Sequence, residues 1–324
     1  MVTIAHLDNG TYTQWAGFLD DIPVFCDAQG YARIVEGATQ QFDLHNGLLC
    51  AVKSMSGAYL LTGGEDGNLC RLDSSGEFRV LFKAGKHWID QIASGPNDSV
   101  AIGAGRYGAI VSGNGKGQEF ETERSIEGLA FAPKGQRLAI ARYDGVELQW
   151  VNSDSANRFL QWKGAHTGVT YSPDGKYVVS TMQENALHGW RLGDGKTMQM
   201  QGYPSKVAST SWSHKGKWLA TSGAPAAIIW PFFGKDGPMG KSPKELGSMG
   251  KILVTQVCCH PAADMLAIGY ENGMIMAASI DDGKIVSLRS GGEGAICAMG
   301  WDKAGGRLAF GSADGEAGII TIAD

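Results

Sequence analysis

Residues 131–140, FAPKGQRLAI, decide the fold, because the pattern of this stretch returns along the chain. An aromatic residue precedes a polar turn that contains Pro or Gly, and a run of apolar and small residues follows. The same frame recurs as YSPDGKYVVS at 171–180 and as WSHKGKWLAT at 212–221. A tryptophan follows each stretch, and these tryptophans, 40 residues apart, are Trp150, Trp190 and Trp230. The chain therefore carries an internal repeat, which has to be interpreted before any other feature.

The repeat continues on both sides of these three stretches. Each copy places an apolar anchor at the same point of the frame, and successive anchors lie 38 to 47 residues apart. The anchors are Leu60, Val100, Leu138, Val178, Leu219, Leu266 and Leu308. A weaker copy at residues 22–35 precedes them. The sequence therefore indicates eight units that fill almost all of the 324 residues.

Each unit has the composition of four short strands. A polar turn such as 172–175 ends the first strand, and a turn with Asp-Gly, as at 66–67, follows the second. Glycine tolerates the positive φ of tight turns, which explains why 47 of the 324 residues are glycine. Four short strands per unit without helical periodicity are typical of a propeller blade. We predict an all-β fold: one β-propeller domain over residues 1–324 with four-stranded blades, eight being favoured over seven.

The two ends of the sequence predict how the last blade is completed. The last unit ends with its third strand at residues 318–324, whereas residues 2–7 are strand-like and precede the first unit. We expect residues 2–7 to pair with that final strand, which closes the propeller and covers an edge. One segment departs from the repeat: residues 234–251 are rich in Gly, Pro and Lys where a fourth strand belongs. We expect an exposed, mobile loop there.

Over nearly the whole chain the repeat resembles the WD-repeat family. The Ser-Pro-Asp-Gly turn at 172–175 and the spaced tryptophans match the pattern of that family. The resemblance implies buried structural networks made of His, Ser or Thr, an acid and Trp. The matching residues are His166, Ser180, Glu184 and Trp190 in the fifth unit, and His45, Thr62 and Asp66 in the second, with Leu72 in place of Trp. Other units are eroded at the Ser/Thr position, where they carry Ile140, Ala220, Ile268 and Phe310.

The composition excludes several classes of partner. Lys and Arg number 28 against 33 Asp and Glu, and the net charge of −5 is unlike that of a general nucleic-acid binder. No run of 18 apolar residues predicts a membrane span, and residues 1–8 lack the features of a secretory signal. The six cysteines are scattered and form no C-x-x-C pair, which is typical of a reducing compartment. We therefore expect a cytoplasmic protein that binds neither nucleic acid nor membrane.

No enzyme signature is present in the sequence. The glycine-rich stretches 63–67 and 103–105 open no helix, and no Walker lysine follows them. The sequence contains neither a G-x-S-x-G elbow nor an H-E-x-x-H motif. We expect no catalysis and no cofactor.

One short cluster, Cys258-Cys259-His260, has side chains that ligate metals. On a strand, Cys258 and His260 share a face and Cys259 points the other way. Two ligands do not complete a zinc site, which needs three or four, so we interpret Cys259 as a core residue and His260 as a turn residue. The alternative function, a metal- or small-ligand-binding accessory protein that uses Cys258 and His260 at the channel mouth, stays open.

The resemblance implies a non-catalytic scaffold that binds a protein or peptide through one face. Propellers of this family generally bind through the loops that enter first strands and the turns between second and third strands. Tyr, Trp and Arg, which dominate binding hot spots, are frequent in these segments. The predicted partner-binding residues are His87, Trp88, Arg106, Tyr107, Arg142, Tyr143, Tyr203, Lys206, Tyr270 and Glu271. The identity of the partner and the oligomeric state stay open.

Overall fold

The computed structural model describes residues 2–153 and 155–322, and almost all of its regular structure is β-strand. Among these residues the helical structure is one 3-10 turn, η1 (Pro96–Asp98), and no helix is long and apolar enough to cross a membrane. The described chain separates into two compact units. The first unit runs to Ala28 and adds Ala32–Gln41 and the chain from Tyr203 onward. The second unit comprises Gln29–Tyr31 and Phe42–Gly202.

Four sheets, each with four described strands, lie wholly or mainly in the first unit. Three of them follow the chain order, and the fourth is joined by the N-terminal strand. The sheets are β2 (Thr13–Leu19), β3 (Ile22–Asp27), β4 (Tyr31–Glu36) and β5 (Ala38–Asp43); β20 (Thr210–Trp212), β21 (Trp218–Thr221), β22 (Ala227–Pro231) and β23 (Lys244–Leu246); β24 (Val254–Cys259), β25 (Met265–Tyr270), β26 (Ile275–Ser279) and β27 (Ile285–Arg289); and β28 (Ile296–Trp301), β29 (Arg307–Ser312), β30 (Glu316–Ile322) and β1 (Val2–Asp8).

The second unit contains three further sheets in the described part of the chain. Two have four strands and the third has six. The sheets are β6 (Leu48–Lys53), β7 (Tyr59–Gly64), β8 (Asn68–Asp73) and β9 (Phe78–Lys83); β10 (Gln91–Ser94), β11 (Val100–Ala104), β12 (Tyr107–Val111) and β13 (Gly117–Glu121); and β14 (Gly128–Phe131), β15 (Arg137–Trp150), β16 (Arg158–Tyr171), β17 (Tyr177–Met182), β18 (Ala186–Arg191) and β19 (Thr197–Met200).

The prediction of eight blades is wrong, because the described strands form seven sheets. The expected fourth and fifth blades are joined in the six-stranded sheet. Within it, β15 and β16 are each 14 residues long and pair with one another. β15 reverses direction at Asp144, whose φ is 67°, and the N–H of Val151 donates to Gln136 O at 3.2 Å. β15 and β16 stay paired on both sides of the irregularity between Tyr143 and Gly145, so one sheet runs from β14 to β19.

The anchors of the repeat lie on the second strand of their sheets or at the equivalent point of the six-stranded sheet. Their exposed fractions are 0–1%. Leu60 pairs with Leu72, Val178 with Trp190 and Leu219 with Trp230, so each anchor faces the third strand in the same register. Anchors also pack against the neighbouring sheet, as Leu266 and Ala220 do in one core cluster. The repeat of about forty residues therefore arises because each repeat buries one apolar side chain at the same position.

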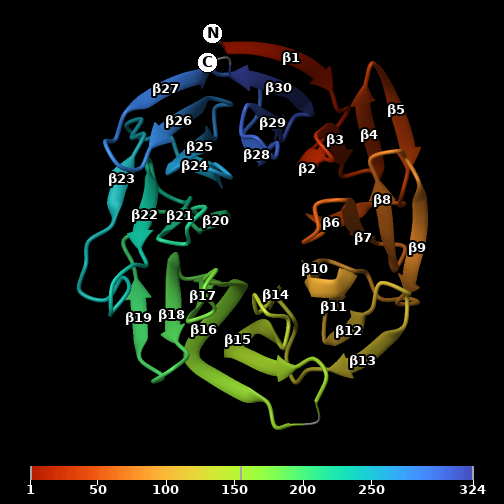
Figure 1. Ribbon diagram of the computed structural model, residues 1–324, viewed down its shortest axis with the longest axis vertical. Helices are drawn as coiled ribbons and strands as arrows, with labels where there is room; N and C mark the ends of the chain where they lie inside the picture. Colours follow the sequence, from red (N-terminus) through yellow and green to blue (C-terminus); the bar gives the residue numbers. More distant parts are fainter. Residues whose placement is uncertain (1, 154, 323–324) are drawn as a thin grey trace. The chain divides into compact units, whose positions relative to one another are not determined.

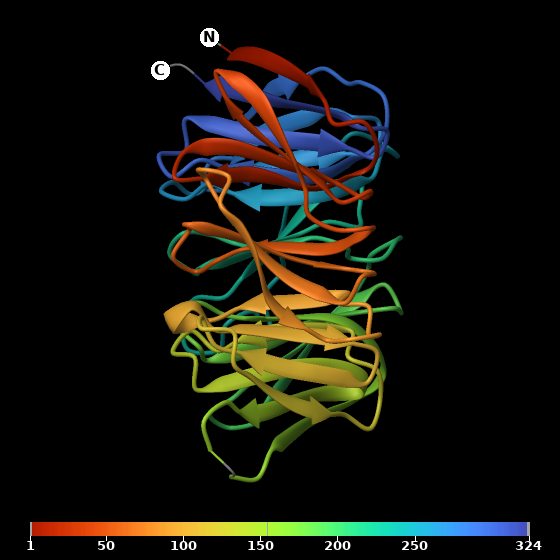
Figure 2. The same cartoon turned by 90° about the vertical axis from the view of Figure 1, so that its right-hand side faces the viewer.

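The N-terminal strand completes the sheet formed by the C-terminal strands, as predicted. β1 pairs antiparallel with β30 in a register that runs from Val2 opposite Ile322 to Asp8 opposite Glu316. Figures 1 and 2 both show β1 beside β30, with β29 and β28 following inward in Figure 1. The strand at one end of the chain is thus held by backbone hydrogen bonds to a strand near the other.

The segment 234–251 differs from the expectation of a loop without a fourth strand. It contains β23, which pairs with β22 through Ala227 opposite Leu246. Lys241 Nζ donates to Phe233 O at 2.6 Å, and Tyr270 Oη donates to Gly247 O. A Gly- and Pro-rich composition masked the strand because only three residues of the segment are needed for pairing.

Candidate interaction surface

In the second unit, loops between strands are hydrogen-bonded to turns between strands. The N–H of Ile89 donates to Gly64 O at 3.1 Å, and the N–H of Ile126 donates to Gly105 O at 2.7 Å. The N–H of Glu65 donates to Gly47 O at 3.0 Å. We name the loops and turns of this kind in the second unit the loop surface, which comprises residues 43–47, 64–67, 84–89, 104–107, 122–127, 142–145 and 164–167.

Gly67 shows how closely two of these segments approach. Its φ is +71°, and a Cβ at this position would lie 2.3 Å from Gly85 O and 3.0 Å from His87 O. Any side chain would therefore clash with the backbone of the neighbouring loop, in addition to the strain of the left-handed conformation. Glycine at position 67 therefore allows the loop 84–89 to lie directly against the turn 64–67.

Three of the predicted partner-binding residues gather at the loop 84–89. The imidazole of His87 stacks on the ring of Tyr107, with centroids 4.5 Å apart and planes 5° from parallel. Trp88 is 57% exposed, whereas the next residue, Ile89, is fully buried. The buried Ile89 anchors the loop, so Trp88 is presented to solvent from a fixed backbone. Burial, and the nearby carboxylate of Glu119, raise the pKa of Tyr107.

Arg106 connects the turn after β11 to the loop after β13. Its Nε donates to Thr122 O at 2.9 Å, and its guanidinium lies 2.9 Å from Glu121. More than half of the side chain is nevertheless exposed. The guanidinium is therefore held in place while part of it stays accessible.

Arg142 and Tyr143, predicted as a pair, differ in environment. The Arg142 side chain is only 11% exposed, lies 3.2 Å from Glu147, and covers the ring of Phe159 at 4.3 Å. Tyr143 is 49% exposed. Arg142 therefore stabilises the fold through its contacts with Glu147 and Phe159, whereas the ring of Tyr143 is accessible to solvent.

A cavity of about 560 Å³, here called the Tyr143 cavity, opens beside this ring. It combines an aromatic ring with groups of both charges and with neutral donors and acceptors. The lining residues are Arg124, Ser125, Glu127, Tyr143, Ala165, His166, Thr167 and Gln183.

His166, which lines the Tyr143 cavity, forms part of the hydrogen-bond network predicted for the fifth repeat of the sequence. His166 is fully buried; its Nδ1 lies 2.7 Å from Ser180 Oγ, and its Nε2 donates to Trp162 O at 2.9 Å. Burial lowers the pKa of His166. The two other predicted members do not bond to the imidazole: Glu184 accepts from the N–H of Ala165 at 3.2 Å, and Trp190 Nε1 has no hydrogen-bond partner in the described structure.

The hydrogen-bond network predicted for the second repeat of the sequence is also present. His45 is buried; its Nε2 lies 2.8 Å from Thr62 Oγ1, and its Nδ1 lies 3.0 Å from an oxygen of Asp66. Burial opposes ionisation of Asp66, but hydrogen bonds from Asn68 and His45 outweigh it and lower the pKa of the carboxyl below its usual value. The network fixes the loop 43–47 to the turn 64–67.

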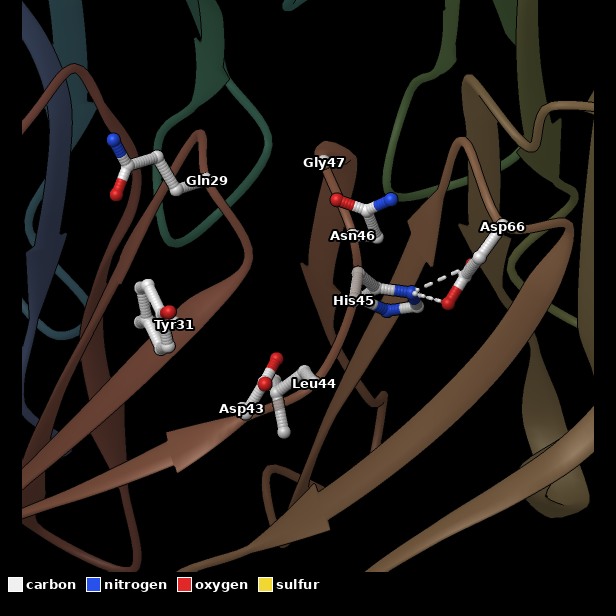
Figure 3. Close-up of a pocket in the computed structure, with 8 residues that line it drawn as sticks. All are labelled: Gln29, Tyr31, Asp43, Leu44, His45, Asn46, Gly47 and Asp66. Atoms are coloured by element: carbon white, nitrogen blue, oxygen red, sulfur yellow. Dashed lines mark hydrogen bonds and ion pairs between the residues drawn. The ribbon is translucent and has the colours of Figure 1, made fainter.

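A second cavity, of about 760 Å³, lies over this network and is here called the His45 cavity. Figure 3 shows Gln29 and Tyr31 on one side of it, and His45, Asn46 and Asp66 on the other. The full lining is Gln29, Tyr31, Asp43, Leu44, His45, Asn46, Gly47 and Asp66. None of these residues is Lys or Arg, so the walls carry negative and neutral polar groups.

The remaining four predicted residues lie in the first unit, and two of them are buried. Tyr203 is 8% exposed, and its hydroxyl lies 2.8 Å from Thr221 Oγ1. Tyr270 is fully buried, and its hydroxyl donates to Gly247 O. Lys206 and Glu271 are exposed, and Glu271 accepts from the N–H of Leu253 at 3.0 Å. Tyr203 and Tyr270 are thus core residues with internally bonded hydroxyls.

Sequence reasoning missed a buried polar network in the first unit. Arg33 donates to Asp27 at 2.8 Å and to the backbone and side chain of Asn9, both at 2.9 Å. The amide of Asn9 in turn donates to Thr13 at 3.1 Å. The signal available was the pairing of an acid at the end of a strand with an arginine six residues later. The network fixes the segment between β1 and β2.

The geometry of Cys258-Cys259-His260 does not favour a metal site. His260 Nδ1 accepts from the N–H groups of Ala262 and Ala263, and its Nε2 lies 3.1 Å from Gly305 O. Burial raises the pKa of the Cys259 thiol to about 12. No group of three His, Cys, Asp or Glu side chains in the described part of the chain is arranged to hold a metal ion.

Comparison with known proteins agrees with this fold. A family model described as "Anaphase-promoting complex subunit 4 WD40 domain" matches residues 247–304. The C-terminal WD40 domain of Sif2 matches with a TM-score of 0.78 at 15% identity, over 100% of this chain and 99% of that one.

Two further solved structures are similar. The computationally designed Ika8 protein has a TM-score of 0.79 at 16% identity, over 97% of this chain and 98% of its own. The β-propeller domain of Cps50 (Swd1) from Myceliophteria thermophila has a TM-score of 0.67 at 13% identity, over 85% of this chain and 96% of its own. The solved structures show the propeller fold, and the family model is similar to residues 247–304, so the resemblance to WD-repeat propellers predicted from the sequence is confirmed.

Proposed function

We propose that this protein is a non-catalytic scaffold that binds a protein or peptide through the loop surface of the second unit. The observation that carries the proposal is Trp88, a tryptophan that is 57% exposed on a loop whose next residue is fully buried. An exposed indole costs solvation and contributes nothing to the core, whereas tryptophan is the residue most enriched at binding hot spots.

The neighbours of Trp88 have the same character. The stacked pair of His87 and Tyr107 and the fixed guanidinium of Arg106 give rigid groups that combine apolar area with hydrogen-bonding atoms. Groups that are already ordered lose little conformational freedom when a partner binds. This pre-organisation supports a binding surface rather than a set of unrelated turn residues.

The Tyr143 cavity extends the surface along the same row. Arg124 and Glu127, which line it, belong to the loop that follows Thr122, and Thr122 O is the acceptor for Arg106. A partner segment that covers Trp88 and Arg106 therefore meets a cavity large enough for one of its side chains. An exposed indole and a stacked His–Tyr pair on the same row as a cavity favour a peptide or protein over a small metabolite.

The test of this proposal is capture of proteins from a lysate of the native cell, compared quantitatively between variants. Trp88→Ala should lower capture of the specific partner on the order of tenfold or more, as truncation of a hot spot does. Met55→Ala is the matched control, because Met55 lies in the same unit, is also 57% exposed and lies outside the loop surface.

Both variants should unfold at the wild-type temperature, since neither side chain is part of the core. Capture that is equal for the Trp88→Ala, Met55→Ala and wild-type proteins would show that the loop surface is not the binding site.

A further inference from the structure

We infer that the His45 cavity binds the cationic side chain of a lysine or arginine of the partner; this inference rests on the proposed function. The cavity measures about 760 Å³, which accommodates the aliphatic stem and charged head of either side chain. Tyr31 and Leu44 supply apolar area for the stem, and Figure 3 shows the ring of Tyr31 across the cavity from His45.

Three of the polar side chains around the cavity have no internal partner. The side chains of Gln29, Asp43 and Asn46 line it and form no hydrogen bond or ion pair within the described residues. Asp43 therefore offers a full carboxylate, and the two amides offer carbonyl oxygens. A guanidinium has five N–H donors and an ammonium has three, so either one can satisfy several of these acceptors together.

The charge of the cavity has one sign. Asp43 and Asp66 line it, and a Cβ on the lining residue Gly47 would lie 3.0 Å from the carboxyl carbon of Glu65. Three carboxylates thus lie in or beside the cavity, and none of its lining residues is Lys or Arg. Phosphate or carboxylate ligands are repelled by this arrangement, and a cation is attracted.

A metal ion fits the walls less well than an organic cation. The Asp66 carboxylate already accepts from His45 and Asn68, so Asp43 is the carboxylate with free oxygens. Divalent ions need several oxygen ligands at short distance, and the described residues contain no such group. A cation that spreads its charge over several N–H donors matches one carboxylate and two amides.

The position of the cavity ties it to the proposed partner site. Asp66 lies in the turn 64–67, and a Cβ at Gly67 of that turn would lie 3.0 Å from His87 O. The loop that carries Trp88 is therefore in contact with one wall of the cavity. A partner segment anchored on Trp88 reaches the His45 cavity at the next turn, where a basic residue meets the carboxylates.

The test uses small cations and their neutral analogues, followed by backbone amide NMR of the whole chain. Nα-acetyl-arginine methylamide and Nα-acetyl-lysine methylamide are the charged probes; the citrulline and Nε-acetyl-lysine analogues have similar shape without the charge. The charged probes should shift the amide signals of Asn46, Gly47 and Asn68 at about millimolar concentration, as expected for single residues. The neutral analogues should shift them at least about tenfold less at equal concentration.

Two variants make the test specific. Asp43→Asn removes the free carboxylate from an exposed position with almost no change of shape, and should weaken the charged probes about tenfold. Asp281→Asn, an exposed aspartate in the turn between β26 and β27, is the control and should bind them as the wild type does.

Charged and neutral probes with equal effects, no shifts at these amides, or an Asp43→Asn variant that binds normally would each overturn the inference. The probes require no partner, so their result is separate from the capture experiment. Failure of Trp88→Ala to reduce capture contradicts the proposed function, whereas failure of the probes contradicts only the occupant assigned to the His45 cavity.

Discussion

The indole N–H of Trp230 donates to the hydroxyl of Tyr203 at 2.6 Å. That hydroxyl lies 2.8 Å from Thr221 Oγ1, and Thr221 donates in turn to Ile228 O at 3.1 Å. A chain of hydrogen bonds thus joins a loop to the second and third strands of one sheet. Tyr203 corresponds in position to His45, because each of the two residues precedes the first strand of its sheet and bonds to a threonine on the second strand.

Removal of the Tyr203 hydroxyl should destabilise the fold. Tyr203→Phe keeps the ring, leaves the N–H of Trp230 without an acceptor, and leaves Thr221 Oγ1 with only its bond to Ile228 O. We expect the free energy of unfolding in urea to fall by about 1–3 kcal/mol. Tyr143→Phe is the control at an exposed tyrosine and should be close to neutral. Equal stability of the two variants would contradict a structural function for the Tyr203 hydroxyl.

Acid should destabilise the second unit through His188. Its imidazole is fully buried, stacks on Trp162 with centroids 3.7 Å apart, and bonds to no group in the described structure through either nitrogen. Burial, and then the neighbouring His166, lower the pKa of His188 to about 3. In the unfolded chain the pKa is about 6.5, so between these values the unfolded state binds a proton that the folded state does not. Stability is therefore lost as pH falls below about 6.5.

The variant His188→Phe isolates this effect from that of the carboxylates. Phe keeps the stacked ring and removes the titrating group, so its free energy of unfolding should fall less steeply with acid. The difference in slope should approach about 1.4 kcal/mol per pH unit between pH 6 and 4. Urea unfolding of both proteins across this range measures it, and parallel curves would contradict the assignment.

The buried pair of Arg33 and Asp27 should be far more sensitive to truncation than an exposed ion pair. Asp27 is 1% exposed, so Asp27→Ala leaves the Arg33 guanidinium without its carboxylate in a largely buried position. We expect a loss of about 3–5 kcal/mol in the free energy of unfolding. Glu121→Ala removes the partner of Arg106 in an ion pair with both side chains more than half exposed, and should cost at most about 1 kcal/mol. Similar losses in the two variants would rule out this view of the buried pair.

Removal of residues 1–8 should expose the edge of β30 and weaken its sheet. β1 pairs with β30 along seven residues, and Ile4 packs against the core cluster that contains Phe310 and Ile320. We expect a lower unfolding temperature and self-association in size-exclusion chromatography with light scattering, because an unpaired apolar edge pairs with other chains. Addition of a synthetic peptide of residues 1–8 should restore the monodisperse protein. Unchanged melting and elution of the shortened chain would contradict a stabilising function of β1.

The sequence predicts the strands well where the repeated positions are occupied by buried apolar side chains. Leu60, Val178 and Leu219 occupy one position of the frame and are all fully buried, because this position faces the third strand. The count of blades was wrong because β15 and β16 stay paired on both sides of the irregularity between Tyr143 and Gly145, and side-chain patterns do not report this continuity of the backbone.

The candidate site was predictable in part. Trp88 and Tyr143 are exposed, as their loops suggested. Tyr203 and Tyr270 are buried, because a tyrosine in a loop has the same sequence signature whether its hydroxyl meets solvent or Thr221 and Gly247. The cavities lay beyond reach, since Gln29 and Asp66 are brought to the His45 cavity only by the packing of segments far apart in the sequence.

The pairing of β1 with β30 sets the order in which this chain can fold during synthesis. β1 leaves the ribosome before every other described strand, whereas its partner is the last of them to be made. Until then β1 has a free edge and no sheet, and the loop to be closed by its pairing is nearly as long as the chain, which costs entropy and time. A slow stretch of translation before β30 would therefore prolong the time during which the edge of β1 is unpaired.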